Sequence, residues 1–158
     1  MQTINLTSIK KEFTVEASQQ TAFEVFTKKM DLWWPRSHHI GSSDMTELIA
    51  ELHEGGRWYS KHTDGSEANI GYVQTYQPYD LFVLAWQIDG DFKCNPNVIT
   101  EVVTEFIAEG PTTTRIKFEH KDLQKLGNGK VVESMDQGWG EIMNHYEQVI
   151  ALNQIDNT

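Results

Sequence analysis

The longest regular pattern of hydrophobic positions lies near the end of the chain, from Ser134 to Leu152. Its apolar residues recur three or four positions apart, as they do on one face of an α-helix. These residues are Met135, Trp139, Ile142, Met143, Tyr146, Val149 and Ile150. The spacing predicts a long amphipathic helix. We expect Ser134 to cap this helix, with Gln137 three residues later as its capping-box partner.

Before this helix, apolar and polar residues alternate in short runs that are typical of strands. Ile9–Glu16 is the first predicted strand, and Ser18 is placed to cap a short helix after it. Pro35 disfavours the helical conformation for the residue before it, so a second helical turn at Asp31–Trp34 should end there. Further strands are predicted at Thr46–Leu52, Arg57–His62, Ala68–Gln77, Leu81–Gln87, Val98–Ala108 and Thr113–His120.

The order of these elements predicts an α+β fold with seven strands. The turns between the later strands are short and contain Gly or Pro, which indicates antiparallel hairpins. A single long helix after a sheet must bury its apolar side on that sheet. We therefore expect a curved antiparallel sheet around the C-terminal helix, two short helices between strands 1 and 2, and room for a cavity. Residues 1–158 should form one domain with a core at about 9–152.

Composition narrows the possible partners. The net charge is −10, which argues against nucleic acid and against an anionic membrane surface, because both attract clustered Lys and Arg. Cys94 is the single cysteine, so no internal disulfide can form, and this fits a reducing compartment. The sequence shows neither a signal peptide nor an apolar run long enough to span a membrane. We predict a cytoplasmic protein.

Several short motifs occur in a fixed order along most of the chain. They are Trp33-Trp34-Pro35, Gly55-Gly56-Arg57-Trp58, Asp64-Gly65, Gly71-Tyr72-Val73, Pro78 to Leu81 leading to Trp86, Thr104-Glu105-Phe106, Thr113 and Gly138-Trp139. Each motif alone is weak. Their order and spacing together resemble the small single-domain relatives of the activator of Hsp90 ATPase, within the START-like, or Bet v 1-like, helix-grip superfamily.

This resemblance implies a helix-grip fold, in which a seven-stranded sheet surrounds the C-terminal helix and both line a cavity. Members of the superfamily include lipid and steroid carriers, aromatic polyketide cyclases, hormone receptors and cochaperone domains. The resemblance therefore implies the fold more narrowly than the function. The cochaperone itself is longer and has a separate N-terminal domain.

The candidate cavity lining comes from strand alternation and from the apolar side of the helix. It consists of Trp58, Ser60, His62, Tyr72, Trp86, Trp139, Met143 and Tyr146. Ser60 and His62 share a face of their strand with Trp58, and this face is expected to be the concave one. For His62, beside a hairpin tip, we favour a solvated side chain over a ligand contact. For Trp86, in an apolar strand, we favour a plain core position.

The other reactive residue types do not form a recognisable catalytic or metal site. His38 and His39, with His53 further on, lack the spacing of metal ligands and are expected to be surface or loop residues. His120 and His145 have no partner that the sequence reveals. Cys94 lacks the local signature of a nucleophile, and the two aspartates around Gly90 are expected to form a turn. We assign no catalytic residue, no metal and no cofactor.

The favoured function is a binding module for a hydrophobic or amphipathic small molecule, such as a lipid or an aromatic polyketide. One alternative is an enzyme of the polyketide cyclase or hydrolase type that uses His62 or a tyrosine for acid–base chemistry. The other is a cochaperone-like domain that binds Hsp90 through an exposed surface around Trp33 and Trp34.

Overall fold

The computed structural model describes residues 8–40, 43–127 and 129–156. Its strands form one antiparallel sheet in the order β1-β7-β6-β5-β4-β3-β2. The strands are β1 Ile9–Val15, β2 Met45–Ala50, β3 Arg57–His62, β4 Glu67–Gln77, β5 Leu81–Trp86, β6 Thr100–Gly110 and β7 Thr113–His120. The helices are α1 Gln19–Thr27, α2 Met30–Trp33, the 3-10 helix η1 Leu123–Leu126 and α3 Gly129–Asp156.

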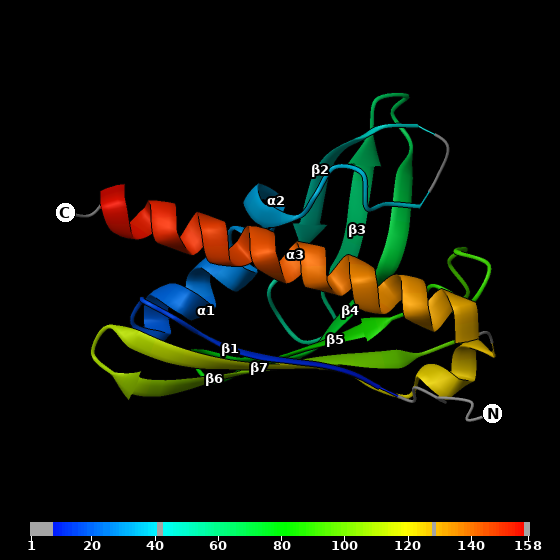
Figure 1. Ribbon diagram of the computed structural model, residues 1–158. Coiled ribbons are helices and arrows are strands. Elements are labelled where there is room, and N and C mark those ends of the chain that lie inside the picture. The colour runs from blue at the N-terminus through cyan, green and yellow to red at the C-terminus, as the bar shows by residue number, and fades with distance from the viewer. Residues whose placement is uncertain (1–7, 41–42, 128, 157–158) are drawn as a thin grey trace.

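The sheet is strongly curled, and α3 runs across its concave side (Figure 1). The strands β2, β3 and β4 stand steeply to β1, β7 and β6, while α1 and α2 lie toward the C-terminal end of α3. Register shifts interrupt the pairing of β2 with β3, of β3 with β4 and of β4 with β5. Such irregularities bend and twist strands. The predicted α+β helix-grip fold is confirmed, including the two short helices between β1 and β2.

The start of α1 and the end of α2 are those that the sequence predicted. The Ser18 hydroxyl accepts a hydrogen bond from the backbone N–H of Thr21 at 3.1 Å, so it caps α1. The second helix, α2, ends at Trp33, and Trp34 is already extended before Pro35.

The start of α3 was predicted wrongly. The helix begins at Gly129, five residues before Ser134, so Ser134 and Gln137 lie inside it and form no capping box. The physical reason is that the apolar side of the helix begins earlier, with Val131 and Val132 buried in the core. The preceding turn, η1, was also not predicted.

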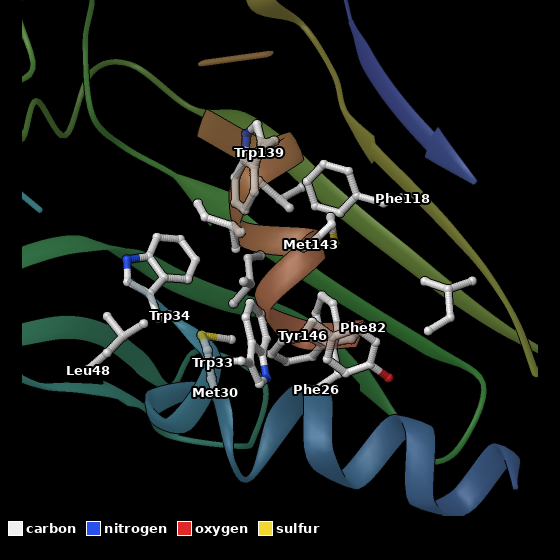
Figure 2. Packing of buried hydrophobic residues seen from close by; sticks show 14 of the residues in the cluster. Phe26, Met30, Trp33, Trp34, Leu48, Phe82, Phe118, Trp139, Met143 and Tyr146 are labelled. Carbon is white, nitrogen blue, oxygen red and sulfur yellow. The ribbon is translucent and has the colours of Figure 1, made fainter. Parts of the chain in front are cut away.

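The core joins the three α-helices around Tyr146. The Tyr146 hydroxyl donates to the Ala22 carbonyl at 2.7 Å, and the Trp33 indole donates to the Val25 carbonyl at 2.9 Å. Figure 2 shows Trp33 beside Tyr146, with Met143 and Trp139 following along α3. Trp33 and Trp34 are only 1% and 6% exposed. The expectation of an exposed surface around these two tryptophans is therefore wrong, because they are core residues.

A candidate ligand cavity between the sheet and the long helix

The concave face of β3 carries Trp58, Ser60 and His62, and all three side chains are buried. This confirms the predicted alternation along the strand. The favoured solvation of His62 is wrong, since the residue is 4% exposed. Its ring is instead held by two hydrogen-bonding partners at 2.8 Å, the hydroxyl of Ser60 at Nε2 and the carbonyl of Ser43 at Nδ1.

Four tryptophans form a closed square beside this row. Each ring of Trp34, Trp58, Trp86 and Trp139 contacts two others of the set, with centroids 5.6–6.0 Å apart. They come from four separate parts of the chain: the segment after α2, then β3, β5 and α3. The tryptophan square therefore ties the sheet to both the long helix and the segment that follows α2. Edge and tilted contacts of this kind are favourable for aromatic rings.

A cavity of about 240 Å³ lies beside the tryptophan square and is lined by three of its four members. Trp34, Trp86 and Trp139 line it, whereas Trp58 lies behind them, with no exposed surface. The remaining lining is apolar on the sheet and helix side and polar at one edge. It consists of Ser37, His38, His39, Ile40, Met45, Ser60, Ile70, Ile88, Phe92, Ser134, Met135, Gly138 and Ile142.

The loop after Pro35 forms the polar edge of the cavity and is fastened to α3. The Trp34 indole donates to the His38 carbonyl at 2.7 Å, and His38 Nε2 lies 3.2 Å from a carboxylate oxygen of Glu141. Gly138 lies directly beneath the His38 ring, where an added Cβ would be 3.6 Å from the imidazole. This distance is an ordinary van der Waals contact, so the loop packs closely over the helix at Gly138 but leaves room for a methyl group.

The structure divides the sequence-predicted lining into two groups. Ser60, Trp86 and Trp139 line the cavity, and Trp86 is at the same time half-buried and packed against the core. The other predicted residues lie elsewhere: Trp58 and His62 are in the layer behind, and Met143 and Tyr146 lie further along α3. Their role in ligand binding stays a prediction.

Tyr72 is displaced from the predicted lining by a change of register. It pairs with Arg57, which alternates with the inward Trp58 along β3. Directly opposed residues of an antiparallel pair share a face, so Tyr72 lies on the convex side of the sheet. The register shift beside Trp58 is responsible, because a shift of one residue reverses the face.

Sequence reasoning missed the loop residues of the cavity. His38 and His39 do lie in a loop, as expected, but both line the cavity. The available signal was Trp34, a large aromatic residue directly before this loop, which needs a buried position. Nothing in the sequence pattern shows onto which part of α3 the loop folds.

The second missed feature is a buried histidine next to the tryptophan square. His120 has no exposed surface, and its Nδ1 accepts a hydrogen bond from the Trp139 indole at 3.1 Å. The neutral ring therefore carries its proton on Nε2, which donates to the Thr100 hydroxyl at 2.8 Å. Burial lowers the pKa of His120 to about 3, so the ring is neutral at ordinary pH.

Other reactive groups have ordinary surroundings. The Asp89 carboxylate accepts from the backbone N–H groups of Asp91 and Lys93, which lowers its pKa and confirms the predicted turn. Partial burial, with a smaller contribution from the Asp89 carboxylate, raises the pKa of the Cys94 thiol. In the described part of the chain, no three His, Cys, Asp or Glu side chains are grouped as metal ligands. No helix among the same residues is long and apolar enough to cross a membrane.

A curled sheet with an apolar cavity beneath its long helix defines this protein as a helix-grip domain. Residues 16–151 match the family described as "Activator of Hsp90 ATPase homolog 1-like protein", and the chain belongs to that family. No curated protein matches the chain.

Three solved structures illustrate the relationship. The anthrahydroquino-gamma-pyrone synthase Txn09 is 29% identical, with a TM-score of 0.66 over 91% of this chain and 97% of its own. The self-sacrificing resistance protein CalC from Micromonospora echinospora is 27% identical, with a TM-score of 0.66 over 92% and 95%. The Hsp90 activator PFC0360w from Plasmodium falciparum is 17% identical, with a TM-score of 0.66 over 92% and 96%, and shows the fold alone.

Proposed function

We propose that the protein binds a compact, flat aromatic molecule in the cavity between the sheet and α3. The observation that carries this proposal is the placement of Trp34, Trp86 and Trp139 around one apolar space. Flat aromatic ligands stack favourably on such rings. Ligand pockets typically enclose about 300–1,000 Å³, so a cavity of about 240 Å³ favours a compact ligand over a long-chain lipid.

The polar edge of the cavity indicates which substituents the ligand carries. Ser37, His38, His39 and Ser60 lie together on the loop and β3 side, whereas the α3 side is mainly apolar. A few placed polar groups in an apolar pocket fix the orientation of a ligand. We therefore expect hydroxyl or carbonyl groups on one edge of the aromatic system.

One of the relatives supports the same ligand class. The 29% identical relative is by name an anthrahydroquino-gamma-pyrone synthase, and this compound type combines fused rings with oxygen substituents. For this protein we propose the same ligand class and not the synthase reaction. The function is thus the binding of an oxygenated polycyclic aromatic compound.

Indole N–H signals in NMR spectra test this proposal directly. The protein, labelled with ¹⁵N, is titrated with a dihydroxyanthraquinone and, separately, with a C16 fatty acid. We expect the quinone to shift the indole signals of Trp34, Trp86 and Trp139. The signal of Trp33 is an internal control, because its indole is bonded to Val25 away from the cavity lining.

A pair of variants on one helix sharpens the experiment. Trp139→Ala should weaken quinone binding at least tenfold, whereas Met143→Ala, one turn further along α3, should retain it. Both residues are buried, but only Trp139 lines the cavity. Equal shifts of all five indoles, or no shift at all, would remove the proposal. If the indole signals broaden on addition of the Hsp90 middle segment but do not shift with either small molecule, the cochaperone-like alternative is favoured.

A further inference from the structure

Ser60 and His62 are adjacent on the concave face of β3, two residues apart. The Ser60 Oγ and His62 Nε2 atoms are 2.8 Å apart, and His62 Nδ1 is 2.8 Å from the Ser43 carbonyl oxygen. A carbonyl only accepts hydrogen bonds, so Nδ1 carries the proton of the neutral ring. His62 Nε2 is therefore the acceptor, and the Ser60 hydroxyl donates to it.

This order of groups is that of an activated nucleophile. A hydroxyl is bonded to a base, and the base is oriented by a third group on its far side. Ser60 lines the cavity, whereas His62 lies behind it. The histidine can therefore act on a ligand only by removing the proton of Ser60.

From this geometry we infer that Ser60 is a nucleophile with His62 as its base, and that the cavity cleaves aryl esters by acyl transfer. This inference rests on the proposed function in one respect: the cavity is expected to hold the aromatic ring of the phenol that the ester releases.

The reaction consists of two balanced steps. In the first, Ser60 Oγ forms a bond to the acyl carbon while its proton passes to His62 Nε2. The bond from the acyl carbon to the aryl oxygen then breaks, and the leaving phenol takes the proton from His62. In the second, water attacks the acyl-serine, with His62 again receiving and returning a proton. The products are a carboxylic acid and free Ser60.

A second serine–histidine contact provides an internal comparison. Ser37 Oγ lies 3.0 Å from His38 Nδ1, and His38 Nε2 faces Glu141. Ser37 is exposed to water, whereas Ser60 and His62 are buried. Hydrogen bonds and charges act more strongly where water is excluded. The structure therefore favours Ser60 over Ser37 as the reactive serine.

The test uses 4-nitrophenyl acetate as the substrate and an alkyl fluorophosphonate as a covalent probe. Nitrophenolate is a good leaving group, so the assay depends little on further stabilisation of the leaving oxygen. We expect a fluorophosphonate adduct on the peptide that contains Ser60, located by mass spectrometry. Ser60→Ala and His62→Gln should each lower the protein-catalysed release of nitrophenolate about 100-fold or more.

Ser66→Ala is the matched control. Ser66 is in the turn between β3 and β4, and its hydroxyl donates to Asp64 and not to a histidine. This variant should keep both the activity and the adduct. An adduct on Ser37, no adduct on any serine, or full activity in Ser60→Ala would overturn the inference. If Ser60→Ala does not fold, the adduct map of the unmodified sequence decides alone.

The outcomes separate this inference from the proposed function. Quinone shifts at the cavity tryptophans without a Ser60 adduct would retain the binding function and reject the nucleophile. A Ser60 adduct without quinone shifts would retain the nucleophile and reject the aromatic ligand.

Discussion

The Trp139 indole donates a hydrogen bond to Nδ1 of His120, 3.1 Å away, and both side chains are buried. On its other side, the histidine bonds the hydroxyl of Thr100. A cavity tryptophan on the helix is thereby attached to two strands of the sheet, β6 and β7. The bond exists only while Nδ1 of His120 is unprotonated.

His120 should make the protein less stable in mild acid. Burial lowers its folded-state pKa to about 3, below an unfolded value near 6.5. Below about pH 6.5 the unfolded chain therefore binds a proton that the folded protein does not, and stability falls as the pH decreases toward 3. We expect His120 to account for a loss of about 2 kcal/mol between pH 7 and pH 5. Urea unfolding at the two pH values measures it.

The variant His120→Gln isolates this contribution, because glutamine does not titrate. It should be less stable at pH 7 but should lose less stability on acidification than the unmodified protein. His53→Gln is the control, since the ring of the exposed His53 contacts the neighbouring Glu54 carbonyl and not a buried group. An unchanged pH dependence in His120→Gln would contradict the assignment.

Thr104→Val should stabilise the protein. Its hydroxyl is buried in β6 and has no hydrogen-bonding partner among the described residues. Valine has nearly the same shape and removes the cost of an unpaired buried group, for an expected gain of about 1 kcal/mol. Thr114→Val is the counterpart, because that hydroxyl donates to the Ala17 carbonyl at 2.8 Å and its loss should destabilise. Denaturant midpoints with unchanged slopes compare the two.

Two glycines should respond oppositely to alanine. In Gly138→Ala, the new methyl would make ordinary contact with the His38 ring, and alanine favours a helix by about 0.8–1.0 kcal/mol. We expect a higher melting temperature. In Gly71→Ala, the methyl would overlap the backbone carbonyl of Ala85, so this variant should unfold far more readily or fail to fold. Thermal scans followed by circular dichroism distinguish these outcomes. A destabilised Gly138→Ala would show that the loop cannot adjust.

Tyr146→Phe should affect stability without affecting the cavity. The change removes the hydrogen bond from the Tyr146 hydroxyl to the Ala22 carbonyl, at an expected cost of about 1 kcal/mol. The residue does not line the cavity, so quinone affinity should stay within twofold of the original. Calorimetric titration of the folded variant measures this affinity. A large loss of affinity would instead support the sequence-based placement of Tyr146 in the site.

Local patterns predicted the elements of the fold well. Alternation located β3 and β7 at their observed bounds, Ser18 located the start of α1, and Pro35 located the end of α2. These signals depend on neighbouring residues only. The prediction for the start of α3 was wrong because Ser134 matched a capping motif. Burial of Val131 and Val132 extends the helix toward the N-terminus, past Ser134.

The cavity was less predictable because it depends on long-range contacts. Alternation correctly placed Ser60 on the concave face, but a register shift in the pairing with β4 moved Tyr72 to the other side. The partnership of His120 with Trp139 joins residues from two elements, and no spacing along the chain encodes it. The same holds for the loop wall at His38, which packs over Gly138 in a helix that is distant in the sequence.

The tryptophan square should also give the folded protein a characteristic near-ultraviolet circular dichroism spectrum. Each of the four indoles contacts two others at centroid distances of 5.6–6.0 Å, close enough for their electronic transitions to couple. Their coupling depends on fixed relative orientations, so the near-ultraviolet circular dichroism of the folded protein reads out the packing around the cavity. A state that kept its helices and strands but loosened this packing would lose that signal first.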